Sequence, residues 1–357
     1  MTQQQQPPQS QKALVGTTEG AIGLVHDAPV PQATGDSIVV KVAAVAVNPV
    51  DSKLVGDYVT PGAAAGFDYA GVVVALGPEA TQFGWKVGDR VCSAVSGMNA
   101  NTPEIGAFAE YTSSPEWFLW RLPDAWTFEQ GASMGISWLT AGMALFHTLN
   151  LPGRPFAPSP KPIQVFVFGG SSSTGVCVIQ LLKLAGFEVI TTCSPHNFDY
   201  VRSFGPDHVL DYKADDVVAQ IKALTKNGLR WVVDCISTTS SMQFCYQVVG
   251  RAGGRFVTLE PFSEAVAQTR KIIKADFVIS PNLLGEVTWP EPHYKPENKE
   301  VIEFGRELVA IVNQLLEKEL IRPHNLLVRN DGLEGISQGL KDIREGKMSG
   351  KKLIYVL

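Results

Sequence analysis

From about residue 163 onward, short apolar runs alternate with amphipathic stretches along the chain. The runs are short and rich in valine and phenylalanine, as expected of strands buried on both faces, and the stretches between them have helical spacing. We expect strands at 163–168, 188–192, 208–210, 230–236, 255–259 and 276–280, and helices at 176–185, 198–204, 214–224, 240–249 and 264–274. This alternation predicts an α/β domain with a doubly wound parallel sheet.

The N-terminal third has a different pattern. Residues 37–47, 69–76 and 87–95 alternate or are rich in valine, and glycine or proline turns separate them, which predicts a compact, barrel-like β domain. Helical stretches at 301–318 and 333–346 and a strand at 352–357 end the chain, and we assign them to this first domain. The expected division is a disordered tail at 1–11, a β-rich domain at 12–127 with 288–357, and a dinucleotide-binding domain at 128–287.

A glycine-rich turn joins the first strand of the α/β domain to its first helix, in the stretch VFVFGGSSSTGVC from Val165 to Cys177. Gly169 and Gly170 allow a sharp turn, Gly175 lies where the helix must pass close to the strand, and Gly186 ends the helix. The free N–H groups and the positive helix end suit a pyrophosphate. The fingerprint is imperfect, because Ser172 occupies the middle glycine position. A serine-rich loop without a ligand is the alternative.

Composition narrows the classes of partner. The chain has 357 residues, a net charge of −5 and no block of lysine or arginine, which argues against nucleic acid and anionic membranes. No apolar stretch approaches the ~20 residues that span a bilayer. The tail MTQQQQPPQSQ lacks the features of a signal peptide, so we expect a cytoplasmic protein. The five scattered cysteines are expected to be buried free thiols.

The residues after the second strand of the α/β domain bear on the choice of dinucleotide. An acidic residue about 20 positions after the glycine turn binds the ribose of NAD, but here that place holds Ser194. The nearest carboxylate is Asp199, one helical turn later, whereas Ser194, His196 and Asn197 could donate hydrogen bonds to a 2′-phosphate. This favours NADPH over NADH. The alternative is a helix-capping segment without a ligand role.

Several motifs resemble the medium-chain dehydrogenase/reductase family: Asn48-Pro49 with Asp51 and Lys53, the run GFDYAGVV from Gly66, and VGDRV from Val87. The resemblance implies a GroES-like β-rich domain beside a Rossmann domain. Zinc members carry a cysteine near the Asn-Pro turn and Gly-His-Glu where this chain has Gly66-Phe67-Asp68. Neither the cysteine nor the histidine is present, nor is a four-cysteine lobe, so no tetrahedral zinc site can be built. We therefore expect no metal.

Within the zinc-free branch, the chain resembles the stand-alone, trans-acting enoyl reductases of fungal polyketide biosynthesis from about Asn48 to Val356. The matching segments are CSPHNFD from Cys193, LDY from Leu210, Asp234-Cys235-Ile236, GRAGG from Gly250 and TWP from Thr288. The resemblance implies NADPH-dependent reduction of an α,β-unsaturated polyketide thioester on a megasynthase carrier domain, by a monomer. Many relatives dimerise instead.

By family position, Lys53 and Thr140 are the catalytic candidates. For both, positioning of the cofactor is favoured over acid catalysis, and the proton could come from water. The alternatives are a solvated loop lysine and a threonine bonded to a preceding carbonyl of its helix. The resemblance places the following residues against NADPH: Asp51, Ser52, Lys53, Ser171, Ser172, Ser173, Thr174, Ser194, Pro195, His196, Asn197, Tyr212, Leu259, Glu260, Gly350 and Lys351.

The acyl pocket is expected along one helix and one later segment. The lining residues would be Trp138, Thr140, Ala141, Gly142, Met143, Ala144, Leu145, Phe146, His147 and Thr148, with Leu283, Leu284, Gly285 and Glu286. Trp138 departs from the family pattern, where smaller residues precede the threonine, and its ring could shorten or redirect the pocket. Ordinary core packing is the alternative for the apolar members.

Two other functions compete with the trans-acting enoyl reductase: a zinc-free quinone or small-enone reductase, and a non-catalytic NADPH-binding partner of the megasynthase. The sequence shows no obvious patch for a carrier protein. Arg251, Arg255 and Lys271 are candidate phosphopantetheine-facing charges, with an ordinary solvated role as the favoured alternative.

Overall fold

The computed structural model describes residues 7–357, which divide into two compact units. Unit 1 comprises residues 7–136 and Pro281–Leu357, and unit 2 comprises Ser137–Ser280. Helix α2 (Phe128–Ala132) and residues 281–287 therefore lie in unit 1, although the sequence assigned them to the dinucleotide-binding domain. Glycine at 131 lets α2 lie against the strands, because a Cβ there would come within 2.7 Å of the Leu122 side chain.

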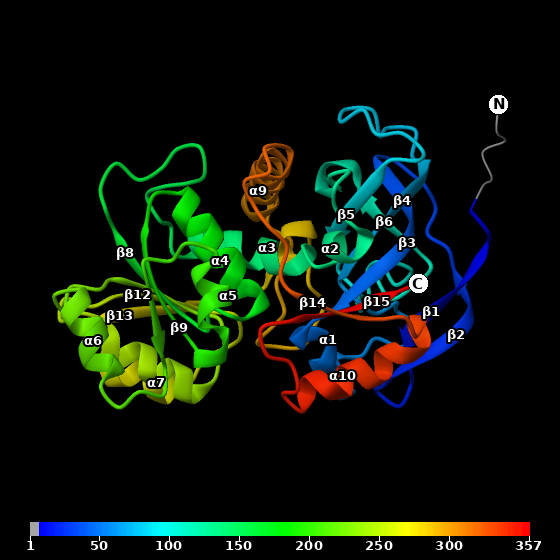
Figure 1. The fold of residues 1–357 in the computed structure, drawn as a ribbon. Helices are drawn as coiled ribbons and strands as arrows, with labels where there is room; N and C mark the ends of the chain where they lie inside the picture. The colour runs from blue at the N-terminus through cyan, green and yellow to red at the C-terminus, as the bar shows by residue number, and fades with distance from the viewer. Residues whose placement is uncertain (1–6) are drawn as a thin grey trace. The chain divides into compact units, whose positions relative to one another are not determined.

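Unit 1 is built on a seven-stranded sheet with the order β14-β15-β3-β4-β5-β7, and β6 pairs with β3 (Figure 1). The C-terminal strand joins the N-terminal ones because β15 pairs antiparallel with β3. A separate ribbon consists of β1 and β2. The strands are β1 (Ser10–Gly16), β2 (Ile22–Pro29), β3 (Ser37–Val47), β4 (Asp68–Leu76), β5 (Arg90–Ala94), β6 (Tyr111–Pro115), β7 (Trp120–Arg121), β14 (Leu326–Arg329) and β15 (Lys352–Val356).

The helices of unit 1 are short except for two near the C-terminus. In α9 the Asn298 side chain caps the first turn, and one apolar stripe is buried, as the sequence pattern predicts. The α-helices are α1 (Pro49–Lys53), α2, α9 (Lys299–Glu317) and α10 (Ile336–Arg344), and 3₁₀ turns are η1 (Gly56–Tyr58), η2 (Glu116–Phe118), η6 (Ser280–Leu284) and η7 (Gly332–Gly335). Helix α3 (Gly135–Gly142) begins in unit 1 and ends in unit 2.

Unit 2 is the doubly wound parallel sheet that the sequence predicts, with the order β10-β9-β8-β11-β12-β13. In chain order this is 3-2-1-4-5-6, the Rossmann arrangement, and it puts the switch point between β8 and β11. The strands are β8 (Gln164–Phe168), β9 (Glu188–Cys193), β10 (His208–Asp211), β11 (Trp231–Asp234), β12 (Gly254–Thr258) and β13 (Ile273–Phe277).

Helices cover both faces of this sheet. One face carries Phe166, Val232 and Phe256 and is buried with apolar residues of α6 and α7 (Figure 1). Helix α4 packs on β8 and β9. The remaining elements of unit 2 are the π-helix η3 (Met143–Thr148), α4 (Ser173–Leu184), η4 (Pro195–Asn197), α5 (Phe198–Arg202), α6 (Val217–Leu224), α7 (Thr239–Val248), α8 (Glu264–Ala267) and η5 (Gln268–Arg270).

Two sequence expectations are wrong in detail. Part of the expected tail at 1–11 is structured, since β1 begins at Ser10 and Gln11 is buried against β2; residues 1–6 of that tail lie outside the described residues. The helix expected at 264–274 stops early, because Ile273 begins β13 and pairs with Gly254, which also moves that strand from its expected position at 276–280.

The five cysteines are free and buried, as expected. Among residues 7–357, no helix combines the length and the apolar character needed to cross a membrane.

Candidate active site

The glycine-rich turn of unit 2 has the geometry of a phosphate cradle. The N–H groups of Gly169 and Gly170 both donate to Thr192 O, at 3.2 and 2.9 Å, which holds the turn at the carboxyl end of β9. Gly169 has a φ of +85°, which favours glycine. A Cβ at Gly175 would lie 2.3 Å from Gly169 O, so α4 passes as close to the turn as the sequence predicts.

Ser172 caps α4, which explains the serine at the middle fingerprint position. Its Oγ accepts a hydrogen bond from Gly175 N at 3.1 Å. The helix start at Ser173 leaves N–H groups of the first turn available to an anion. These residues fit a pyrophosphate, and the nicotinamide dinucleotide that it belongs to would supply a hydride when bound.

A buried polar network shapes the edge of unit 2 beside this turn. Asp234 ends β11, is fully buried, and accepts hydrogen bonds from Ile236 N, Ser237 N and, at 2.6 Å, Ser241 Oγ. Burial raises the pKa of the Asp234 carboxyl. Ser237 Oγ in turn accepts from Leu259 N at 2.9 Å, so the network holds a residue predicted to contact the cofactor. Sequence reasoning did not single out Ser237 or Ser241.

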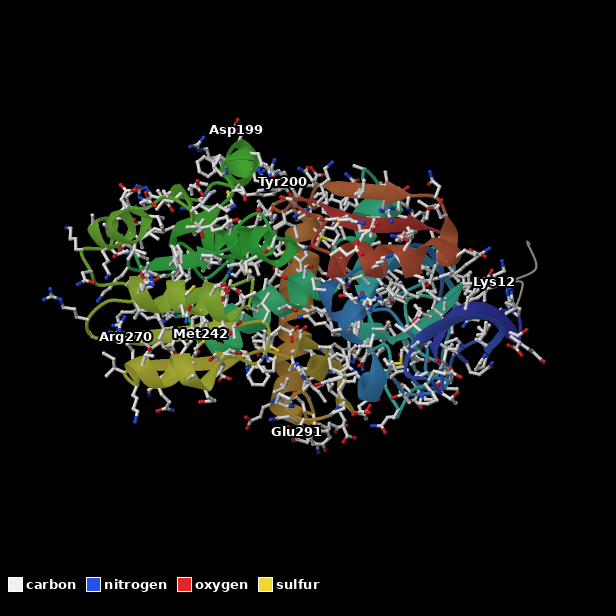
Figure 2. All side chains as sticks on the ribbon, turned by 90° about the horizontal axis from the view of Figure 1, so that it is seen from below. Lys12, Asp199, Tyr200, Met242, Arg270 and Glu291 are labelled. Atoms are coloured by element: carbon white, nitrogen blue, oxygen red, sulfur yellow. The ribbon has the colours of Figure 1, made fainter. Side chains whose placement is uncertain are left out.

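The segments predicted to bind the adenosine end follow neighbouring strands. Cys193 at the end of β9 pairs with Asp211 at the end of β10, so 194–197 and Tyr212 begin at adjacent strand ends. His196 is exposed and Tyr212 is partly exposed, with its ring edge-on to Phe168. Asp199 lies on α5 with a fully exposed side chain that pairs with Arg202 at 3.3 Å (Figure 2).

Lys213 is a cation at this edge that sequence reasoning missed. It is exposed, directly follows Tyr212, and its Nζ lies 5.6 Å from the centroid of the Tyr212 ring. Lys213 could have been predicted from the sequence, because the end of the third strand of a Rossmann sheet lies beside the end of the second, so a lysine that follows the third strand is close to 194–197.

Thr140 has a partner that the sequence did not suggest. Its Oγ1 lies 2.7 Å from Ser280 Oγ, and Ser280 is buried while Thr140 is partly exposed. A second pair of hydroxyls joins Ser137 to Ser173 at 2.8 Å. The Thr140 hydroxyl therefore pairs with Ser280 rather than with a carbonyl of its own helix, which was the alternative. Its catalytic role stays a prediction.

The helix predicted to line the acyl pocket changes its winding. After Gly142 it continues as the π-helix η3, and Leu149 N donates to Ala144 O at 2.9 Å. Such π-turns occur frequently at functional sites. Trp138, Leu145 and Phe146 are buried, whereas His147 is exposed. Burial of this kind agrees with ordinary core packing, so their pocket role also stays a prediction.

In unit 1, the Asn-Pro segment forms helix α1 and buries two of its three predicted cofactor contacts. Asp51 is 1% exposed, and its Oδ2 accepts from Asn48 N at 2.7 Å as part of a capping box. Burial raises its pKa to about 8, and Oδ1 has no hydrogen-bond partner. Ser52 Oγ donates to Pro49 O. Cofactor contacts of Asp51 and Ser52 would thus use backbone groups, whereas Lys53 presents an exposed side chain.

A buried ion pair joins distant segments of unit 1. Lys352 Nζ lies 2.9 Å from Asp68 Oδ2, and the two side chains are 3% and 0% exposed. Asn48 donates to the same oxygen at 2.9 Å and accepts from Lys352, and Ile136 N donates to Asp68 Oδ1 at 2.5 Å. One carboxylate therefore connects β4, β15, the start of α1 and the start of α3. Lys352 was not among the predicted site residues.

This cluster does not fit a zinc ion. Phe67 stands where zinc members have histidine, and the Asp68 carboxylate is engaged by an ammonium group, which has no lone pair for a metal. Among the residues from 7 to 357, no group of three or more His, Cys, Asp or Glu could hold a metal ion.

The remaining predicted contacts of unit 1 lie on η6 and the loop after it, and in the loop before β15. Leu283 is buried, Gly285 has a φ of +137°, and the Glu286 carboxylate accepts from Asn101 and Tyr294, each at 2.9 Å. The preceding Leu284 is partly exposed. Gly350, with a φ of +61°, and the exposed Lys351 directly precede β15.

Comparison with known proteins agrees with this architecture. Residues 34–124 match the alcohol dehydrogenase GroES-like domain, and residues 173–291 match the zinc-binding dehydrogenase family. The fold is similar to a putative zinc-dependent alcohol dehydrogenase from Rhizobium etli (TM-score 0.77, 24% identity, 98% of each chain) and to the CurK enoyl reductase (TM-score 0.72, 17% identity, 97% of this chain and 99% of that one). A mycobacterial protein solved with NADPH, Rv1454c, has a TM-score of 0.71 at 21% identity over 98% of this chain and all of the other.

The curated relatives are much more similar in sequence. The trans-enoyl reductase pvhC of Talaromyces variabilis is 58% identical over 348 residues, 97% of each chain. The trans-enoyl reductase eqxC of Fusarium heterosporum is 54% identical over 97% of this chain and 99% of its own. The resemblance stated from the sequence is confirmed: the chain belongs to the trans-enoyl reductases of the medium-chain dehydrogenase/reductase family.

Proposed function

We propose that this protein is a trans-acting enoyl reductase that reduces the carbon–carbon double bond of an α,β-unsaturated polyketide thioester on the carrier domain of a separate synthase, with NADPH as the reductant. The observation that carries the proposal is identity of 54–58% to trans-enoyl reductases over 97% of the chain. In the reaction, the β-carbon gains a hydride from NADPH and the α-carbon gains a proton, so the double bond becomes single and NADP⁺ is released.

The residues of this chain would bind and orient the reactants. The start of α4 would bind the pyrophosphate through backbone N–H groups of its first turn, beside the turn at Gly169–Gly170 that Thr192 O holds in place. The Thr140 and Ser280 hydroxyls form a pair that could donate a hydrogen bond to the nicotinamide or to the thioester oxygen, where negative charge develops. Lys53 would hold the cofactor with its exposed ammonium group. Water would supply the proton.

NADPH is the proposed dinucleotide because the edge after β9 and β10 offers donors and a cation to a 2′-phosphate. Lys213 and His196 are exposed there, and the side chain of Asp199 points to solvent on α5.

The variant Lys213→Glu tests this assignment by replacing the cation. It should raise the Kd of NADPH at least ~10-fold, because a charge-assisted bond to the 2′-phosphate is lost, and should change the Kd of NADH little. Lys226→Glu, at an exposed lysine after α6, is the control. An equal loss for both dinucleotides would contradict the assignment.

The activity is tested by NADPH consumption with a crotonyl or α-methylcrotonyl pantetheine thioester, beside a benzoquinone control. We expect consumption with the thioester and not with the quinone. Consumption with the quinone alone would assign the protein to the quinone reductases. NADPH binding without reduction of the thioester, or of an enoyl chain on the intact synthase, would instead support a non-catalytic binding partner.

A further inference from the structure

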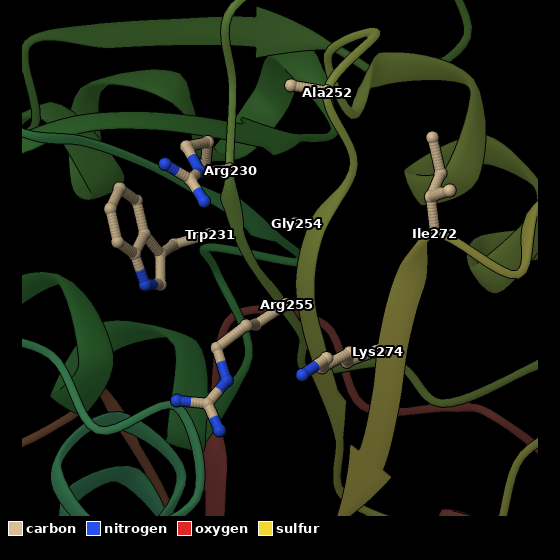
Figure 3. A pocket seen from close by; sticks show the side chains of 7 residues that line it. All are labelled: Arg230, Trp231, Ala252, Gly254, Arg255, Ile272 and Lys274. Atoms are coloured by element: carbon tan, nitrogen blue, oxygen red, sulfur yellow. The ribbon is translucent and has the colours of Figure 1, made fainter.

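A basic hollow lies on unit 2 at the amino ends of three adjacent strands, β11, β12 and β13 (Figure 3). Its volume is about 460 Å³, and its lining residues are Arg230, Trp231, Ala252, Gly254, Arg255, Ile272 and Lys274. The nucleotide turn is at the carboxyl ends of the same sheet. The hollow is therefore a separate feature, and the proposed reaction does not use it.

The strand register concentrates positive charge in this hollow. Trp231 pairs with Arg255, and Arg255 pairs with Lys274, so the three side chains form a row on one face of the sheet. Neighbouring parallel strands are about 5 Å apart, so the row is on the order of 10 Å long. Like charges on adjacent strands destabilise a sheet unless an anion compensates them. None of the seven lining residues, all in the described part of the chain, is acidic.

The nearest carboxylate along β13, Asp276, bonds to a backbone N–H group and not to the cations of this row. Asp276 follows Lys274 by two residues, and its Oδ1 accepts from Phe277 N at 2.8 Å. Arg230, Arg255 and Lys274 are all exposed. The hollow therefore presents three positive charges to solvent on a chain whose net charge is −5.

Two contacts order the hollow, and apolar surface borders it. Arg255 Nη1 donates to Leu149 O at 3.0 Å, which fixes the guanidinium before any ligand arrives. Arg230 lies over the Trp231 ring, 5.6 Å from its centroid. Ile272 is 57% exposed. Arginine and tryptophan beside an exposed aliphatic side chain are the composition of protein-binding hot spots.

We infer that this hollow docks an acidic surface of the polyketide synthase, whose carboxylates pair with Arg230, Arg255 and Lys274 while an apolar side chain covers Ile272. The inference rests on the proposed function, which requires a partner that carries the substrate. Three exposed cations, two of them side by side on adjacent strands, together with an apolar border match a protein surface better than a single phosphate, which one or two cations would bind. Charge pairing here would raise the association rate and set the orientation of the partner.

The test separates docking from catalysis by comparing two substrates. In the double variant R230E/K274E, Arg255 is retained because its guanidinium also binds Leu149 O. With an enoyl chain on the intact synthase, we expect KM to rise at least ~10-fold and the salt dependence of the rate to weaken. With the free crotonyl pantetheine thioester, kcat/KM should stay within about twofold, because the reaction site is unchanged. Lys86→Glu, at an exposed lysine before β5, is the matched control.

Direct binding gives an independent readout. Sedimentation with the intact synthase should show a complex for wild type and for K86E but a Kd at least ~10-fold higher for R230E/K274E. Unchanged binding of the double variant would overturn the inference, as would an equal loss of activity toward both substrates. Failure of wild type to reduce either substrate while the synthase still binds refutes the proposed activity, and the binding data then decide the docking surface alone.

Discussion

Substitution of Lys352 by methionine tests the ion pair that connects four segments of unit 1. The side chains of Lys352 and Asp68 are 3% and 0% exposed and lie 2.9 Å apart. Methionine occupies a similar volume but removes the ammonium group. The Asp68 carboxylate would keep its bonds from Asn48 and Ile136 but would be left as a buried charge without a counterion.

The expected cost follows from that uncompensated charge. Removing one partner of a buried ion pair destabilises a protein by about 3–5 kcal/mol, a large part of the ~5–15 kcal/mol that folds a typical domain. The double variant D68N/K352M removes both charges. It should recover at least ~2 kcal/mol relative to K352M, because the desolvated carboxylate is gone.

The free energy of unfolding can be measured by urea denaturation followed by circular dichroism, with hydrogen exchange at Ile136 and Asn48 to localise the loss to unit 1. Lys86→Met, at an exposed lysine, is the control and should change stability by less than ~0.5 kcal/mol. A cost below ~1 kcal/mol for K352M would refute the reasoning, as would a D68N/K352M variant no more stable than K352M.

Three further predictions concern buried groups. Burial raises the pKa of Asp51 to about 8, above the ~4 of an unfolded chain, so the folded state binds one more proton than the unfolded state between these pH values. The free energy of unfolding therefore falls as pH rises through this range. D51N should flatten the slope of unfolding free energy between pH ~6 and ~8.5, and an unchanged slope would assign the proton to another group. In G175A the new Cβ would lie 2.3 Å from Gly169 O, so we expect thermal unfolding to show a stability loss of about 1–3 kcal/mol and titration to show weaker NADPH binding. The control G228A, whose new Cβ would have its nearest atom at 3.3 Å, should change neither quantity. Equal behaviour of the two variants would contradict the close approach of α4 to the turn. S241A removes the 2.6 Å bond to Asp234 and should cost about 1–3 kcal/mol, measured by urea unfolding, while a neutral result would mean that water replaces the hydroxyl.

Local sequence patterns determined most of unit 2. Runs of valine and phenylalanine can be buried on both faces only within a covered parallel sheet, and the glycines at 169, 170 and 175 permit one tight turn before a helix. Gly186 ends α4 with a φ of +80°, again as the sequence predicts. These features depend on residues that are close together in the chain, so periodicity and conformational preference suffice to predict them.

The start of β13 could not be predicted from local sequence patterns. The residues after Glu264 have helical spacing, but α8 ends at Ala267 and η5 at Arg270, and the backbone of Ile273 pairs with Gly254 on β12. Arg270 also donates to the carbonyls of Tyr246, Val249 and Gly250, which fixes the turn before the strand. A hydrogen bond to a neighbouring strand depends on the sheet being assembled, and no local preference encodes it.

The sequence by itself determined the family, the doubly wound sheet and the phosphate-binding turn, because each is encoded in a short run of residues. Only the tertiary structure decided that Lys352 neutralises Asp68, 284 positions away, that Thr140 pairs with Ser280, and that Arg230, Arg255 and Lys274 share one hollow. The physical reason is the same in each case. Charge and hydrogen-bond partners are set by distance in space, and the sequence gives distance only along the chain.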